Sequence, residues 1–204
     1  MTESDRPGPV AETRQRLIEG ACRAYEDQGI EGVRLGHLLE AAGVSRRTFY
    51  LYFSGKDALL VAVYDEVVGD LIHRVRQRVL DAEDATERLF AGLDAYLDFQ
   101  ERGGRLITLL QAEAANPASS LNPAREQTLD ALVGLMDEQV RATLDVALDP
   151  LVYRALFVAV EGLVIHVRSG GAFTAEGRAA VSAVMRPLFL QTVTGHALLP
   201  RVAD

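Results

Sequence analysis

Apolar residues recur at helical spacing along almost the whole chain. In residues 12–28 they share one helical face, at positions 17, 18, 21, 22 and 25. A second, shorter amphipathic segment carries Leu35, Leu38, Leu39 and Ala42. Residues 45–52 form a third segment, and strand-like alternation persists nowhere in the sequence. The pattern therefore predicts an all-α fold.

Longer helical segments follow the first three. The next begins near position 57 and continues for about 25 residues, roughly 38 Å at 1.5 Å per residue. The later segments are predicted at about 85–101, 105–115, 122–146, 151–168 and 175–195. Glycine and proline mark their ends, at Gly103-Gly104, Asn116-Pro117, Asp149-Pro150 and Gly170-Gly171. We predict about nine helices, with a mobile loop at 116–123.

The junction between the second and third segments has the pattern of a helix-turn-helix. Gly43 follows an apolar helical run, where a left-handed residue closes a helix at no steric cost to glycine. Ser45 then stands where a hydroxyl can accept a hydrogen bond from the next helix. That helix carries arginines and tyrosines, which are donors to duplex DNA. The pattern indicates a DNA-binding protein.

Charge is distributed unevenly along the 204 residues, whose net charge is -8. Residues 1–56 hold eight basic and eight acidic residues, whereas 57–204 hold thirteen and twenty-one. Within 44–56, Arg46, Arg47 and Lys56 have no acidic residue among them. The local field matters more than total charge for docking on phosphates, so the acidic remainder does not exclude DNA binding.

Several classes of protein are disfavoured by composition. No uninterrupted apolar run approaches the roughly 18 residues that span a bilayer, and Met1–Val10 lacks the apolar region of a secretory signal. The single cysteine cannot form an internal disulfide framework. His73, His166 and His196 are scattered, without metal-ligand spacing. We expect a cytoplasmic protein that has no membrane association, no metal site and no cofactor.

Two runs of residues agree in register with a known family. They are Thr13-Arg14-x-x-Leu17-Ile18-x-x-Ala21-x-x-x-Tyr25-x-x-x-Gly29 and Leu38-x-x-Ala41-x-Gly43-Val44-Ser45-x-x-Thr48-Phe49-Tyr50-x-Tyr52-Phe53-x-x-Lys56-x-x-Leu59. In these positions about the first 60 residues resemble a TetR-family transcriptional regulator. Two positions depart from the family pattern. Val33-Arg34 stands where a threonine or serine is usual, and Arg47 where a small residue is frequent.

The resemblance implies a homodimer whose subunits each have a DNA-binding head and a helical body. We assign the helix-turn-helix domain to 11–57 and the effector-binding and dimerisation domain to 58–204. The body of such a protein typically encloses a small-molecule pocket, and a bound ligand weakens operator binding. The segment 151–167 is apolar nearly all round and needs extra cover, so we expect the last two helices to form the dimer contact.

Candidate DNA contacts follow from helical spacing in the third segment. Phe49 and Phe53 are predicted to face the core, opposite Arg46, Arg47, Tyr50 and Leu51. Each arginine can present a bidentate fork to guanine, although a solvated pair or phosphate contact alone is the alternative. Tyr50, Tyr52 and Lys56 resemble the family's phosphate-contacting set. The remaining candidates for DNA contact are Arg34, His37, Ser45 and Thr48.

Candidate pocket residues lie on faces of the body helices that we expect to turn inward. The apolar ones, most of which also suit a plain core, are Val63, Val67, Phe90, Leu93, Leu97, Leu110, Met136 and Phe157. Glu113 and Glu161 are carboxylates in apolar helices, where an unpaired charge is costly. Each could pair with an arginine across the dimer or orient a ligand.

The sequence favours a ligand-responsive repressor that binds a pseudo-palindromic operator as a homodimer and is released by a small-molecule effector. A DNA-binding activator or architectural protein without an effector is the main alternative, and a small-molecule carrier is another. A helical enzyme is a weaker one, because the sequence has no glycine-rich phosphate loop, nucleophile elbow or convergent acid–base pair. We therefore expect no catalytic activity.

Overall fold

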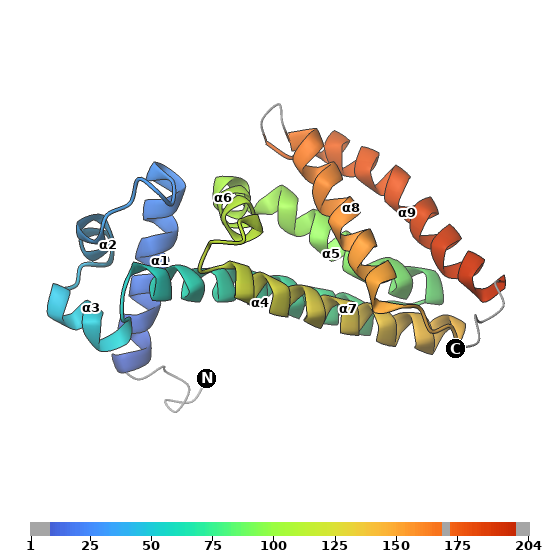
Figure 1. The fold of residues 1–204 in the computed structure, drawn as a ribbon, viewed down its shortest axis with the longest axis horizontal. Helices are drawn as coiled ribbons and strands as arrows, with labels where there is room; N and C mark the ends of the chain where they lie inside the picture. The colour runs from blue at the N-terminus through green and yellow to red at the C-terminus, as the bar shows by residue number, and fades with distance from the viewer. Residues whose placement is uncertain (1–8, 169–171, 199–204) are drawn as a thin grey trace. The chain divides into compact units, whose positions relative to one another are not determined.

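The computed structural model describes residues 9–168 and 172–198 of the chain. Over these ranges it contains nine helices and no strand (Figure 1). Their bounds are α1 Pro9–Gln28, α2 Leu35–Ala42, α3 Arg46–Tyr52, α4 Lys56–Asp81, α5 Ala85–Arg102, α6 Gly104–Ala115, α7 Asn122–Leu144, α8 Pro150–Arg168 and α9 Ala175–Leu198. The predicted all-α fold is confirmed.

The helices form two compact units. The head unit consists of the described part of Met1–Val68 together with Arg105–Arg125, and the body unit contains Gly69–Gly104 and the described part of Glu126–Asp204. This division differs from the predicted domains 11–57 and 58–204. The first turns of α4 and most of α6 belong with α1 to α3, because their apolar side chains complete the head core.

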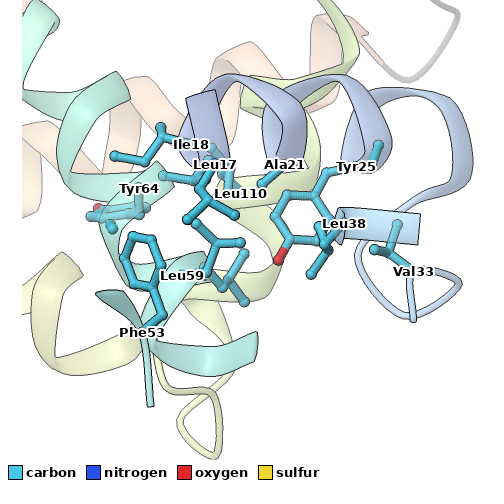
Figure 2. Close-up of a cluster of buried hydrophobic side chains, with 14 of the residues drawn as sticks. Leu17, Ile18, Ala21, Tyr25, Val33, Leu38, Phe53, Leu59, Tyr64 and Leu110 are labelled. Atoms are coloured by element: carbon cyan, nitrogen blue, oxygen red, sulfur yellow. The ribbon is translucent and has the colours of Figure 1, made fainter. Parts of the chain in front are cut away.

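The head core gathers side chains from α1, α2, α3, α4 and α6. Leu17, Tyr25, Leu38 and Leu59 are almost completely buried in it (Figure 2). The main chains of α1 and α2 approach closely at Gly20. A Cβ atom there would lie 2.9 Å from the Ala42 nitrogen and 3.0 Å from the Ala41 carbonyl carbon. The absence of a side chain at Gly20 therefore permits this crossing.

The stretch 116–123, predicted as a mobile loop, is instead held by hydrogen bonds. The Asn116 side chain accepts from the Ala118 N–H at 3.0 Å, and the Ser119 hydroxyl accepts from the Leu121 N–H at 3.2 Å. The Asn122 amide donates to the Ala114 carbonyl at 3.2 Å. Because Leu121 is also fully buried in the head core, these local turns are part of the packed structure.

Two predicted helix ends have different outcomes. The helix predicted to end near Asp149-Pro150 stops at Leu144, because Asp145 adopts a left-handed φ of 53°. The Asp145 N–H donates to the Arg141 carbonyl at 3.0 Å and closes the last turn. The end predicted at Gly170-Gly171 lies outside the described residues, as does most of Met1–Val10.

The body unit is held by an apolar core and by ion pairs between its helices. Phe90 of α5 meets Phe189 of α9 edge to face, with ring centroids 5.7 Å apart. Beside them, Arg186 of α9 donates to both carboxylate oxygens of Asp94, at 2.8 and 2.6 Å. The Arg186 guanidinium also lies 4.5 Å from the Phe90 ring centroid. One cation thus joins α5 to α9 by charge and by packing.

Helix α8 is the one helix in the described ranges that is long and apolar enough to cross a membrane, by length and composition only. Its mean hydropathy over 18 residues is 1.6. Arg154 and Glu161 interrupt its apolar run, as the sequence indicates. Tyr153 and Val164 are completely buried in the body core. Only 22% of that 18-residue window is buried, so packing with the other body helices covers a minority of the apolar run.

Candidate nucleic-acid interface

The turn between α2 and α3 is closed at Gly43, as predicted. Gly43 adopts φ 64° and ψ 39°, the left-handed conformation that glycine reaches without a Cβ clash. Its N–H donates to the Glu40 carbonyl, and the Val44 N–H donates to the Leu39 carbonyl, both at 3.1 Å. This pair of bonds is a Schellman motif. It ends α2 sharply and turns the chain into the next helix.

Helix α3 begins at a hydroxyl cap, which is also confirmed. The Ser45 Oγ accepts a hydrogen bond from the Thr48 N–H at 3.0 Å. The two hydroxyls, Ser45 Oγ and Thr48 Oγ1, are a further 2.9 Å apart. Both predicted DNA-contact residues therefore take part in the cap. Their shared bonds fix the first turn of α3, which carries the two arginines.

The two faces of α3 differ as the spacing predicts. Phe49 is fully buried and Phe53 is 6% exposed, so the aromatic side packs into the head. On the other side, Tyr50 is 52% and Leu51 is 76% exposed. The predicted contacts Arg46 and Arg47 are exposed as well. Tyr52 differs, because it is half-buried and packs against the head core.

The start of α2 is capped by a histidine instead of a hydroxyl. Arg34 occupies the N-cap position, and its backbone N–H donates to the His37 Nδ1 at 3.2 Å. His37 is half-buried, because it folds back over this turn. A neutral imidazole that accepts at Nδ1 carries its proton on Nε2, where it can still donate. The Arg34 side chain remains exposed and available to an anion.

Lys56, at the first position of α4, is part of the fold as well as a candidate for phosphate contact. Its Nζ donates to the main-chain carbonyl of Val33, the residue before the α2 cap. The side chain is half-buried. The bond connects the start of α4 to the residue before α2. Lys56 is therefore held next to the N-cap of α2, which is Arg34.

The outer face of the helix-turn-helix carries unpaired cations. Within residues 9–168 and 172–198, Arg34, Arg46 and Arg47 have no acidic partner within ion-pair distance. Guanidinium groups in this state can form bidentate hydrogen bonds with phosphates or guanine edges. The exposed tyrosine adds a hydroxyl donor. Fold and site together define a helix-turn-helix protein of the nucleic-acid-binding class.

The body unit contains a cavity of about 290 Å³. Its walls come from α4, α5, α7 and α8 and are mostly apolar. Two predicted pocket residues, Met136 and Phe157, line it. An adjoining cavity of about 40 Å³ is lined by these two and by the predicted Phe90 and Leu93. Four of the predicted pocket residues are thus brought together.

The other predicted pocket residues lie elsewhere. Val63 and Leu110 are buried in the head core, and Val67 packs against it. Leu97 is fully buried in the body core. Glu113 in α6 and Glu161 in α8 are half-buried. Apolar spacing alone identifies an inward face but does not distinguish a cavity wall from a filled core.

Sequence reasoning missed two kinds of cavity residue. Leu71 and Val75 of α4 line the cavity, although their periodicity predicted only a helix. Arg76 and Arg88 line it too, and neither carries a motif that marks it. On the cavity wall formed by α7, Val140 is fully buried. The cavity could be found only from the packed helices.

Comparison with known proteins identifies the class more closely. Residues 17–63 match the family described as "Bacterial regulatory proteins, tetR family". The match covers α2, α3, most of α1 and the first turns of α4, and so includes the whole helix-turn-helix. Over these residues the chain matches the family that its sequence resembles, and the predicted resemblance is confirmed.

Individual relatives agree with this assignment. The HTH-type transcriptional activator FasR of Mycolicibacterium smegmatis is 34% identical over 102 residues, which cover 48% of this chain and 47% of FasR. The chain spans between about half and two thirds of the first curated relatives that it matches.

Solved structures extend the likeness of fold over most of the chain. FadR from Bacillus subtilis, in complex with stearoyl-CoA, superposes with a TM-score of 0.71 at 17% identity and covers 86% of this chain and 96% of its own. A putative transcriptional regulator from Pseudomonas aeruginosa PAO1 gives 0.73 at 20% identity, with coverage of 96% and 98%. At these identities the comparison shows a shared fold.

Proposed function

We propose that the chain is a ligand-responsive transcriptional repressor in the cytoplasm. It binds a pseudo-palindromic operator in double-stranded DNA as a homodimer, and a small-molecule effector releases it. The observation that carries this proposal is the exposed pair Arg46 and Arg47 on the outer face of a capped α3, which has no acidic partner in the described part of the chain. The function consists of binding and release, with no catalytic step.

On DNA, α3 is the helix that enters the major groove. Arg46 and Arg47 contact base edges there, while Tyr50 and Leu51 extend the contact along the groove wall. Arg34, Tyr52 and Lys56 hold phosphates on either side, with the His37 Nε2 as a further donor. Ser45 and Thr48 serve this interface through the cap that positions the first turn of α3.

The homodimer forms through α8 and α9, which lie side by side in the body unit (Figure 1). An apolar stripe on α8 remains exposed at seven-residue intervals, at Leu151, Val158 and Ile165. On α9, Val184 and Leu188 are exposed one turn apart. Large apolar side chains in regular rows are costly in water, and a second copy that presents the same rows would cover them.

The effector binds in the 290 Å³ cavity of the body unit. Helix α4 would couple effector binding to DNA binding. It begins with the candidate phosphate contact Lys56 and carries the cavity residues Leu71 and Val75 further along. A ligand that prefers one arrangement of this helix shifts the population of DNA-competent dimers. The likeness to a FadR structure that holds stearoyl-CoA supports a ligand-binding role for the body.

Selection of bound fragments from random DNA, followed by transcription in vitro from a promoter that contains the selected site, tests the proposal. We expect a palindromic consensus and blocked transcription. Failure to enrich any sequence at low salt would refute specific DNA binding. Activation instead of blockage would favour the alternative suggested by the match to the activator FasR.

A further inference from the structure

Two arginines that line the body cavity are unlike the other arginines of this unit. In the described part of the body, eight arginines contact an Asp, Glu or Gln side chain: Arg74, Arg78, Arg102, Arg141, Arg154, Arg168, Arg178 and Arg186. Arg76 and Arg88 have no such partner there. Both line the 290 Å³ cavity.

The rest of the cavity offers little to a polar ligand. Most of its wall consists of leucine, valine, methionine and phenylalanine side chains from four helices. The other polar side chains on it belong to Glu138, Gln139 and Tyr96, so two guanidinium groups face a single carboxylate. Arg76 is exposed and Arg88 is half-buried, so both guanidinium groups are accessible at the cavity wall to an anionic group of a ligand.

We propose that the effector is an anionic amphiphile. Its unbranched apolar chain fills the cavity, and its carboxylate or phosphate group is held by Arg76 and Arg88. This assignment rests on the proposed function, because it names the ligand class of the same cavity. Guanidinium groups bind both kinds of anion through paired N–H donors, so the chemistry that they share is a compact oxyanion at the end of an apolar chain.

The second cavity favours a chain over a compact ring system. It has a volume of about 40 Å³ and shares Gly92, Met136 and Phe157 with the first, together with Leu89 and Tyr96. Methionine is flexible and adapts to irregular apolar shapes. Met136 lines both spaces, so a change of its rotamer is the adjustment by which a linear chain would extend from one space into the other.

Gly92 provides a way to block this space. It belongs to the walls of both cavities, and a Cβ atom built on it would meet nothing within 4 Å. A leucine there would fill the cavity without forcing the backbone to move. Gly134 in α7 is the matched control, because its Cβ would also meet nothing, it is exposed, and it lines neither cavity.

Calorimetric titration of the full chain without DNA tests the ligand class. The probes are decanoate, decyl phosphate, 1-decanol and decyltrimethylammonium, which share one chain and differ in the head group. We expect at least one of the two anions to bind about tenfold or more tightly than the alcohol, and the cation to bind more weakly than the alcohol. The tighter anion then distinguishes a carboxylate from a phosphate headgroup. Equal binding of alcohol and anions would overturn the assignment.

Variants test the residues. The double variant R76Q/R88Q should lower the affinity for the anion about tenfold or more and leave decanol within about twofold. R74Q, on the same helix, removes an arginine already paired with Asp70 and should change neither. G92L should abolish binding of every probe, whereas G134L should not. An anion preference that survives R76Q/R88Q would refute the role of the two arginines.

Measuring affinity for the selected operator with and without each probe distinguishes failure of the ligand class from failure of the proposed function. If decanoate binds through Arg76 and Arg88 but leaves DNA affinity unchanged, the ligand class stands and the effector role fails. If a neutral or cationic molecule releases the DNA while both anions fail to bind, the repressor stands and the anionic ligand is wrong.

Discussion

The ammonium group of Lys56 donates a hydrogen bond to the main-chain carbonyl of Val33. Val33 is fully buried, and a buried carbonyl without a donor is costly. Lys56 is also the only lysine in the chain. The residue that we expect to contact DNA phosphate therefore also holds α4 to the segment before α2. An ammonium has three donors, so both roles can be filled at once.

Replacing Lys56 by alanine should affect both stability and DNA binding. We expect the free energy of unfolding to fall by about 1–2 kcal/mol, because the Val33 carbonyl loses its donor. DNA affinity should fall alike for all sequences, and the slope of log affinity against log salt should flatten by about one unit. Urea denaturation and salt titration measure the two effects. K56R keeps the charge and should retain the slope.

Replacing Arg46 by alanine should relax base preference instead. A guanidinium that binds guanine in a bidentate manner contributes about 1–3 kcal/mol of discrimination. We expect that loss at particular base pairs when binding is measured on a set of single-substitution operators. Arg34 is also exposed but lies at the α2 cap, so R34A should weaken every operator equally. Uniform losses for R46A would show that Arg46 contacts only phosphate.

Replacing Ser45 by alanine should destabilise the head unit. The substitution removes the acceptor of the Thr48 N–H and the hydroxyl next to Thr48 Oγ1. Loss of such a cap typically costs about 1 kcal/mol. Ser120 is exposed and lies outside every helix, so S120A is the control for thermal unfolding and should leave the midpoint unchanged. Equal midpoints for S45A and the wild type would contradict the cap.

Two glycine-to-alanine changes should have opposite effects on stability. At Gly20 the new methyl group would meet the α2 backbone at 2.9–3.0 Å, and overpacking of this kind costs about 1–3 kcal/mol. At Gly36, inside α2, a Cβ meets nothing within 4 Å. G36A should therefore gain up to about 1 kcal/mol of helix propensity. Denaturant titration of both variants gives the comparison, and a stable G20A would contradict the close crossing.

A charge placed on the exposed stripe of α8 should break the proposed homodimer. Ile165 is 61% exposed, and a glutamate there would place an unpaired charge in an apolar interface. Sedimentation of I165E should show a monomer, together with weaker operator binding. L144E, at the exposed end of α7, is the control and should remain a dimer. A dimeric I165E would exclude this face.

The sequence alone determined the local structure of the helix-turn-helix, namely its helix ends, its cap and its buried face. Gly43 and Ser45 predicted the end of α2 and the cap of α3, and four-residue spacing predicted which side of α3 is buried. These features depend on atoms within one or two helical turns, so neighbouring residue types are enough to specify them. The same holds for the helix count, because apolar periodicity reports each helix separately.

Only the tertiary structure decided which distant residues meet. Lys56 reaches a carbonyl 23 positions away, and α6 supplies Leu110 to the head core instead of to a pocket. Arg76 and Arg88 stand out only because, among the residues that the structure describes, they have no acidic partner and line an apolar cavity. A helical face that is apolar can fill a core or line a space, and only the packing of the other helices determines which.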